Sequence, residues 1–183
     1  MDRFSEQLIT KYPDGKDKLI RALIIIGEIL LLALLALVGF FIPAAFIVCA
    51  LAALGSIFLI KYLMECTMHE YEYIVTNDDL DIDKITGQRN RKRLITISLR
   101  TVREMGRYSG EELKADVTVV AHDGTGEDLF YLIADSEKYG AVALLFNPDE
   151  RTTRNIVGGF EPKLKMEYTK KFGIKEEAEE IGN

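Results

Sequence analysis

The sequence predicts an α+β membrane protein, in which a two-helix transmembrane hairpin precedes a mainly antiparallel β domain that ends in a helix. Two observations support this fold class. Two long apolar runs, residues 22–42 and 44–63, follow each other almost directly. From residue 71 onward, apolar residues instead alternate with polar ones, which is the period of β-strands.

Each apolar run is long enough to cross a bilayer as a helix. A hydrocarbon core about 30 Å thick needs about 20 apolar residues when each adds about 1.5 Å to the helix. Residues 22–42 and 44–63 meet that length, and the turn before Pro43 carries no charged residue. Backbone groups in lipid are satisfied only in helices or closed barrels, so the sequence predicts a helical hairpin over residues 19–64.

Lysine and arginine residues are distributed unevenly around this hairpin. None lies in its turn, whereas five precede the first run: Arg3, Lys11, Lys16, Lys18 and Arg21. By the positive-inside rule we expect a multi-pass protein of the cell membrane with both termini in the cytoplasm. The first run is too long for the apolar core of a signal peptide, and no small-residue cleavage site precedes Pro43, so we expect it to be retained.

Seven short strands are predicted between about residues 71 and 146, separated by turn signals such as Asp123-Gly124. Residues 129–134 are apolar on both faces, which predicts a central strand. Residues 141–146 fit a seventh strand, but the alternative is a helix over residues 136–146. The helix-start signal at Pro148 favours the strand, and a helix over about residues 149–158 then follows.

These elements divide the chain into four predicted parts. They are a cytoplasmic lead (residues 1–18), the transmembrane hairpin (19–64), a cytoplasmic β domain (65–160) and a charged C-terminal tail (161–183).

Seven antiparallel strands closed by a C-terminal helix is the order of a pleckstrin-homology-like domain. The tyrosine-rich strand Tyr71-Glu72-Tyr73-Ile74-Val75 and the segment Leu80-Asp81-Ile82-Asp83 resemble bacterial versions of that fold. The whole chain resembles an uncharacterised family of small two-span membrane proteins from Gram-positive anaerobes, whose cytoplasmic domain is pleckstrin-homology-like. The resemblance implies no catalytic activity. Lipid-binding pleckstrin-homology domains of eukaryotes commonly place a cluster of cations in the loop after their first strand. This chain has the acidic segment Asn77-Asp78-Asp79 in that loop.

The densest group of cations is the basic segment, which we define as Arg89, Arg91, Lys92 and Arg93. Cations close to an anionic leaflet gain about 1 kcal/mol each. The basic segment is therefore the candidate contact for membrane lipid, with a membrane protein partner or a second copy of the chain as alternatives. The competing interpretation is a solvated strand edge, where charge prevents unwanted strand pairing.

Glu28 is the one acidic residue within the apolar runs. If the turn is centred near Ile42, antiparallel pairing places Glu28 at the depth of Ser56, whose hydroxyl can donate to the carboxylate. We interpret this intramembrane polar pair as a packing contact within the hairpin or an oligomer. The alternative is a subunit of an oligomeric transporter that uses Glu28, because acids within the membrane are often functional.

The chain carries no recognisable catalytic motif. It lacks a glycine-rich phosphate-binding loop and the G-x-S-x-G nucleophile elbow. Asp81 and Asp83 alternate with Leu80 and Ile82, so an exposed sheet face explains them better than an acid–base pair. We therefore expect a non-enzymatic protein with no catalytic residue and no cofactor.

Metal and nucleic-acid binding are also disfavoured by the sequence. Cys66, His69 and Glu70 form only a weak metal-ligand pattern, and we expect no metal site. The net charge of −6 and the lack of an exposed aromatic motif beside the basic segment argue against a nucleic-acid partner. The function that remains is a membrane-anchored binding or scaffolding module.

The orientation can be tested by labelling. We predict that single cysteines introduced after Met64, in a variant whose native Cys49 and Cys66 are serine, resist a membrane-impermeant maleimide added to intact cells. The same cysteines should react after lysis. Labelling in intact cells would contradict the orientation.

Overall fold

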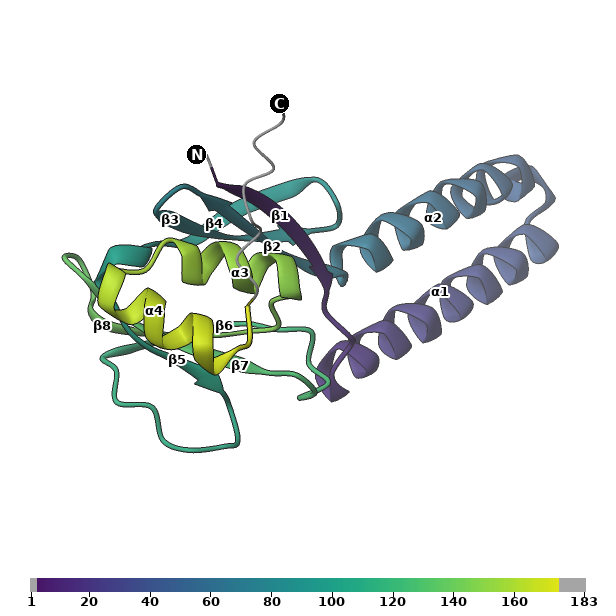
Figure 1. The fold of residues 1–183 in the computed structure, drawn as a ribbon. Coiled ribbons are helices and arrows are strands. Elements are labelled where there is room, and N and C mark those ends of the chain that lie inside the picture. The colour runs from purple at the N-terminus through teal and green to yellow at the C-terminus, as the bar shows by residue number, and fades with distance from the viewer. Residues whose placement is uncertain (1–2, 175–183) are drawn as a thin grey trace, which may run out of the picture. The chain divides into compact units, whose positions relative to one another are not determined.

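The computed structural model describes residues 3–174, and these comprise strands, a helical hairpin and two C-terminal helices (Figure 1). Strand β1 (Phe4–Thr10) precedes helices α1 (Gly15–Phe41) and α2 (Phe46–Cys66), which are joined by the short 3-10 helix η1 (Pro43–Ala45). The later strands are β2 (His69–Thr76), β3 (Asp79–Thr86), β4 (Asn90–Ser98), β5 (Val102–Arg107), β6 (Val117–Ala121), β7 (Phe130–Ser136) and β8 (Gly140–Phe146). The 3-10 helix η2 (Leu99–Thr101) links β4 to β5, and α3 (Glu150–Gly158) and α4 (Pro162–Lys171) follow β8.

The strands form two four-stranded sheets, with the orders β1-β2-β3-β4 and β5-β7-β8-β6. In the second sheet β7 is antiparallel to both β5 and β8, whereas β6 is parallel to β8. The prediction of a mainly antiparallel α+β fold is confirmed, and β7 is a central strand as its apolar faces predict. The alternative helix over residues 136–146 is wrong, because residues 140–146 pair with β7 along their whole length.

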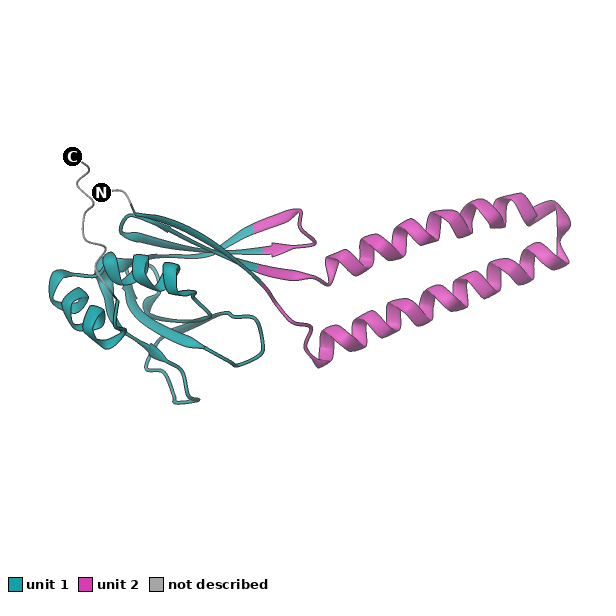
Figure 2. Cartoon of the chain, turned by 45° about the vertical axis from the view of Figure 1, so that its right-hand side comes forward, with its two compact units in different colours: residues 1–9, 71–84, 92–183 teal, residues 10–70, 85–91 magenta. Residues whose placement is uncertain are grey.

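The chain divides into two compact units (Figure 2). Of the described residues, the domain unit contains residues 3–9, 71–84 and 92–174. The hairpin unit contains residues 10–70 and 85–91, so the turn between β3 and β4 belongs to it.

The hairpin unit is built on two helices that are long and apolar enough to cross a membrane. Only 6% of the apolar window of each helix is buried, so neither is the core helix of a globular domain. The side chain of Asp14 accepts from the Asp17 N–H at 2.8 Å, and Asp17 accepts from the Asp14 N–H at 3.3 Å. This capping box satisfies free N–H groups at the start of α1.

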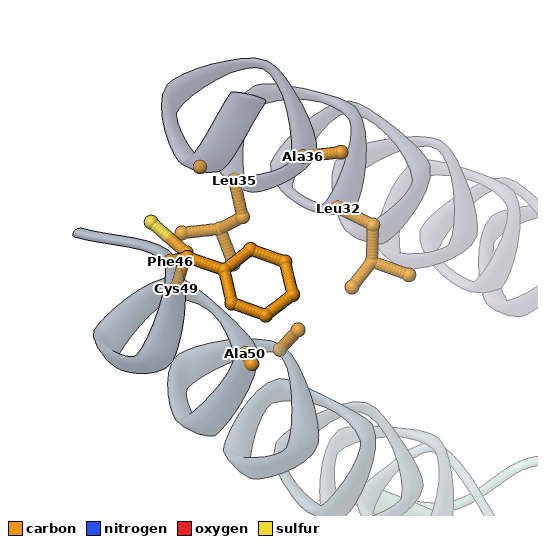
Figure 3. A pocket seen from close by; sticks show the side chains of 8 residues that line it. Leu32, Leu35, Ala36, Phe46, Cys49 and Ala50 are labelled. Carbon is orange, nitrogen blue, oxygen red and sulfur yellow. The ribbon is translucent and has the colours of Figure 1, made fainter. Parts of the chain in front are cut away.

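Small residues let the two helices approach each other near their turn. Gly39 is buried, and a Cβ at this position would lie 3.6 Å from the Phe46 ring and 3.7 Å from Cys49 Cβ. The Phe46 ring lies between the helices (Figure 3). It lines an apolar pocket of about 150 Å³ together with Leu32, Leu35, Ala36, Gly39, Cys49, Ala50 and Ala53.

The core of the domain unit centres on Tyr73 of β2, which is fully buried. Its ring meets the Phe146 ring edge to face, with the centroids 5.7 Å apart. The Tyr73 hydroxyl donates to the Ala121 carbonyl oxygen and accepts from the Asn147 N–H at 3.2 Å. Burial raises the pKa of the Tyr73 hydroxyl. Through its ring contact with Phe146 and its hydroxyl bond to Ala121, Tyr73 ties β2 to the second sheet.

The structure differs from the expected lead over residues 1–18, because residues 4–10 form strand β1. Two of the inward-facing residues of β1, Ser5 and Gln7, are polar, with Ser5 only 1% exposed and Ile9 packed against the core, whereas Phe4 and Leu8 are more than half exposed. This reversed alternation does not have the pattern of an ordinary half-buried strand.

The structure also differs from the expected tail over residues 161–183, because residues 162–171 form α4; residues 175–183 lie outside the described part. Tyr168 of α4 is buried, and its hydroxyl accepts from the Met105 N–H at 3.0 Å. Leu164, Tyr168 and Phe172 are spaced by four residues, which is the helical signal in this lysine-rich segment.

Gly159, which follows α3, has no room for a side chain. A Cβ there would lie 2.5 Å from Leu99 Cδ1 and 2.9 Å from Leu99 Cβ, and the second atom cannot rotate away. We predict that Gly159→Ala lowers the free energy of unfolding by about 1–3 kcal/mol, the usual cost of overpacking. Thermal unfolding of the full-length protein in detergent measures this.

The neighbouring Gly158→Ala is the matched control. Its Cβ would meet mainly the flexible Arg3 side chain, at 3.1 Å from Cδ, so we expect a much smaller change. Equal destabilisation by the two substitutions would contradict the packing around Leu99.

Candidate functional site

The basic segment lies at the turn between β3 and β4 and at the start of β4. Gly87 and Gln88 have φ values of 61° and 58°, and the Arg89 N–H donates to the Thr86 carbonyl oxygen at 3.4 Å. Positive φ at both central residues is the geometry of a tight type I′ hairpin turn. The glycine at position 87 favours this turn, because glycine adopts positive φ readily. We call residues 85–91 the β3–β4 tip.

The β3–β4 tip packs against the end of α2 within the hairpin unit. The Gly87 N–H donates to the Met68 carbonyl oxygen at 3.1 Å, and a Cβ on Gly87 would lie 3.3 Å from the Glu65 carbonyl oxygen. The Arg89 guanidinium lies 3.5 Å from the Glu65 carboxylate. These contacts fix Arg89 beside the last turn of α2.

Further contacts join the start of α1, and the residues just before it, to the segment that follows α2; we call these two regions the bases of the helices. Arg21 Nε donates to Thr67 Oγ1 at 2.8 Å, and its terminal nitrogen lies 3.3 Å from the Thr67 carbonyl oxygen. An arginine suits this place, because the last carbonyls of α2 carry partial negative charge. The Lys11 N–H donates to the His69 carbonyl oxygen at 2.9 Å. Although burial opposes the charged form of Lys11, hydrogen bonds to Asp17 and Asp14 raise its pKa.

The structure separates the four cations of the basic segment. Arg89 and Arg91 belong to the hairpin unit, whereas Lys92 and Arg93 belong to the domain unit. Arg91 and Lys92 are exposed. Arg93 forms ion pairs with Asp81, at 2.6 Å, and with Asp83. The hydrogen bond to Asp83 is the main reason that the pKa of Arg93 is raised.

Asp83 corrects one interpretation of the sequence. An exposed sheet face was expected for Asp81 and Asp83, but Asp83 is only 3% exposed and Asp81 is half-buried. A carboxylate is buried at acceptable cost only when it is paired, and Arg93 supplies that pairing from the neighbouring strand. In the sequence, the signal for this pairing was the presence of opposite charges on two strands that are joined by a tight turn.

The acidic loop after β2 is occupied by arginines of the same chain. Asp78 lies 2.8 Å from the terminal nitrogen of Arg3 and 2.7 Å from Arg100 Nε. The hydrogen bond from Arg100, and then the charges of Arg100 and Arg3, lower the pKa of Asp78. The carboxylate of Asp78 in this loop is therefore neutralised by two arginines of the same chain.

The structure brings Glu28 and Ser56 together within the hairpin. Ser56 Oγ lies 2.7 Å from Glu28 Oε1 and 2.9 Å from the Ala53 carbonyl oxygen. Ser56 is 6% exposed, and it is the one buried residue of α2. The depth matching expected from the sequence thus corresponds to a direct contact between the two helices.

Cys66, His69 and Glu70 do not form a metal centre in the structure. Among residues 3–174, no group of three or more histidine, cysteine, aspartate and glutamate side chains is arranged to hold a metal ion. Cys66 is exposed and Cys49 is half-buried, and neither is in a disulfide.

Comparison with known proteins identifies a family for the chain. A family model described as "Bacterial PH-like domain (DUF6106)" matches residues 1–166, which include the helical hairpin as well as all eight strands. No curated protein and no solved structure matches the chain. Since the match covers most of its length, the chain belongs to the bacterial PH-like domain family DUF6106.

Proposed function

We propose that the protein is a non-enzymatic binding module, anchored in the cell membrane by its hairpin, that contacts lipid headgroups at the cytoplasmic surface through the β3–β4 tip. The observation that carries this proposal is the position of Arg89. The apolar run of α2 ends at about residue 63, and Arg89 pairs with Glu65 two residues later. Arg89 is thereby held at the depth where headgroups begin.

The charge distribution supports a lipid contact at this level. Arg89 and Arg91 of the tip share the hairpin unit with Lys16, Lys18 and Arg21 at the start of α1 and with Lys61 at the end of α2. Cations near an anionic leaflet gain about 1 kcal/mol each. Because the hairpin keeps these residues at the membrane, even a weak contact is populated.

Within the basic segment, Arg89 and Arg91 carry the proposal. Arg93 pairs with two carboxylates, Asp81 and Asp83, so it has less charge to offer a phosphate than Arg89, which pairs with one carboxylate and whose side chain is 70% exposed. Arg93 is therefore assigned a smaller part in lipid binding than the sequence alone suggests, and Lys92 belongs to the domain unit, outside the β3–β4 tip.

We predict that Arg89→Ser combined with Arg91→Ser lowers the preference of the full-length protein for anionic lipid by on the order of 10- to 30-fold, since two surface cations are lost. Native mass spectrometry of protein extracted from mixed phosphatidylglycerol and phosphatidylcholine membranes counts the retained lipids.

The matched control is Arg151→Ser with Lys163→Ser, which removes the same charge from exposed positions of the domain unit. We expect the control to retain the wild-type preference. If the two double variants behave alike, the tip is not the lipid contact. Crosslinking in native membranes then tests a protein partner, which would be lost from the tip variant alone.

Packing between α1 and α2 best explains the presence of Glu28 within the hairpin. We predict that Glu28→Gln preserves assembly and folding, because a glutamine amide can still bond to Ser56 Oγ, and such interhelical bonds contribute only about 0.6–2 kcal/mol. Thermal unfolding and cysteine crosslinking between α1 and α2 measure this. An ion or proton flux that is present in the wild type and abolished in an intact Glu28→Gln protein would instead favour the transporter alternative.

A further inference from the structure

A groove lies between the end of α2 and the β3–β4 tip, entirely within the hairpin unit. Its volume is about 320 Å³, which is within the size range of sites that hold a small ligand. Its lining residues are Lys61, Met64, Glu65, Met68, Gly87 and Gln88.

The lining combines apolar and polar groups. Met64 and Met68 supply an apolar wall, and the Met68 side chain is 43% exposed. Lys61, Glu65 and Gln88 supply an ammonium, a carboxylate and an amide. A molecule that fits this lining must itself be part apolar and part charged, as a phospholipid is at the junction of its headgroup and acyl chains.

The depth of the groove selects the same class of ligand. Lys61 lies inside the apolar run of α2, two residues before its end. A lysine at this place extends its ammonium toward the headgroups while its methylene chain stays along apolar surface. The groove therefore meets lipid at the level of the phosphate.

The charges of the groove are matched to one phosphodiester. Glu65 is four residues after Lys61 on the same helix, and its carboxylate lies 3.5 Å from the Arg89 guanidinium. The groove and its rim thus hold two cations, Lys61 and Arg89, and one carboxylate, Glu65, which sums to one positive charge. A phosphodiester carries one negative charge, and the Arg89 side chain, which is 70% exposed although it pairs with Glu65, borders the groove beside that carboxylate.

We propose that this groove binds the headgroup of one anionic phospholipid, with its phosphate between Lys61 and Arg89 and its glycerol backbone against Met64 and Met68. This inference rests on the proposed lipid-binding function and deepens it. It replaces a diffuse attraction for the leaflet by a single site with a stoichiometry of one lipid per chain.

Substitutions of opposite sign test the site. We expect Lys61→Gln and Gln88→Glu each to weaken retention of one phosphatidylglycerol molecule at least fivefold, because one removes a cation and the other adds a carboxylate. Glu65→Gln should strengthen retention, because it removes the competing anion. Lys18→Gln is the matched comparison, since it removes one exposed cation of the α1 base outside the groove and should therefore weaken retention less than Lys61→Gln.

The readout is native mass spectrometry of the full-length protein titrated with phosphatidylglycerol or phosphatidylcholine, with circular dichroism to establish that each variant is folded. Greater weakening by Lys61→Gln than by Lys18→Gln, together with strengthening by Glu65→Gln, supports the site. Equal effects of Lys61→Gln and Lys18→Gln overturn it, as does equal retention of phosphatidylcholine.

Failure of the groove is distinguishable from failure of the proposed function. If lipid attraction is diffuse, Arg89→Ser with Arg91→Ser still lowers the preference for anionic lipid. The groove variants then change the retention of phosphatidylglycerol no more than Lys18→Gln does. If lipid binding itself is wrong, neither set of substitutions changes the lipids that the protein retains.

Discussion

The pairing of β1 with β2 is the constraint on which the rest of the structure depends. These neighbouring strands of one sheet are separated in sequence by the whole helical hairpin. Their pairing is antiparallel: the Asn77 N–H donates to the Arg3 carbonyl oxygen at 2.8 Å, and the Lys11 N–H donates to the His69 carbonyl oxygen at 2.9 Å. The hairpin is thus an insertion into the β1–β2 connection, and only residues 11–14 and 67–68 link the strands to the helices.

This topology brings the residues on either side of the helical hairpin together. Within the hairpin unit, the Arg21 side chain donates to Thr67 and the Lys11 N–H donates to the His69 carbonyl oxygen, and the β3–β4 tip is held against α2 by Gly87 and Arg89. Fixed cations lose little conformational entropy when they meet a headgroup, which favours binding. The chain as a whole carries a net charge of −6, so the proposed attraction to an anionic surface would depend on this local arrangement and not on overall charge.

Local sequence patterns predicted most of the fold, and the features that they missed depend on distant contacts. The apolar runs and the alternating segments correspond to α1, α2 and β2 to β8, since each pattern is set within its own element. Strand β1 was missed because its buried Ser5 and exposed Phe4 reverse the usual alternation, and because its partner lies beyond the hairpin. The contact of Glu28 with Ser56 followed from the position of the turn and the antiparallel pairing of the two helices, whereas the pairing of Arg93 with Asp83 required the register of β3 against β4.

Amide hydrogen exchange of the full-length protein in lipid nanodiscs tests the central claim that a strand preceding the hairpin completes the sheet that follows it. If β1 pairs with β2, amides in residues 4–10 are protected to an extent comparable with those of β2, because interstrand hydrogen bonds must open before exchange. Exchange of residues 4–10 at the rate of an unstructured peptide, beside a protected β2, would contradict the insertion topology and the anchoring of the helix bases that is derived from it.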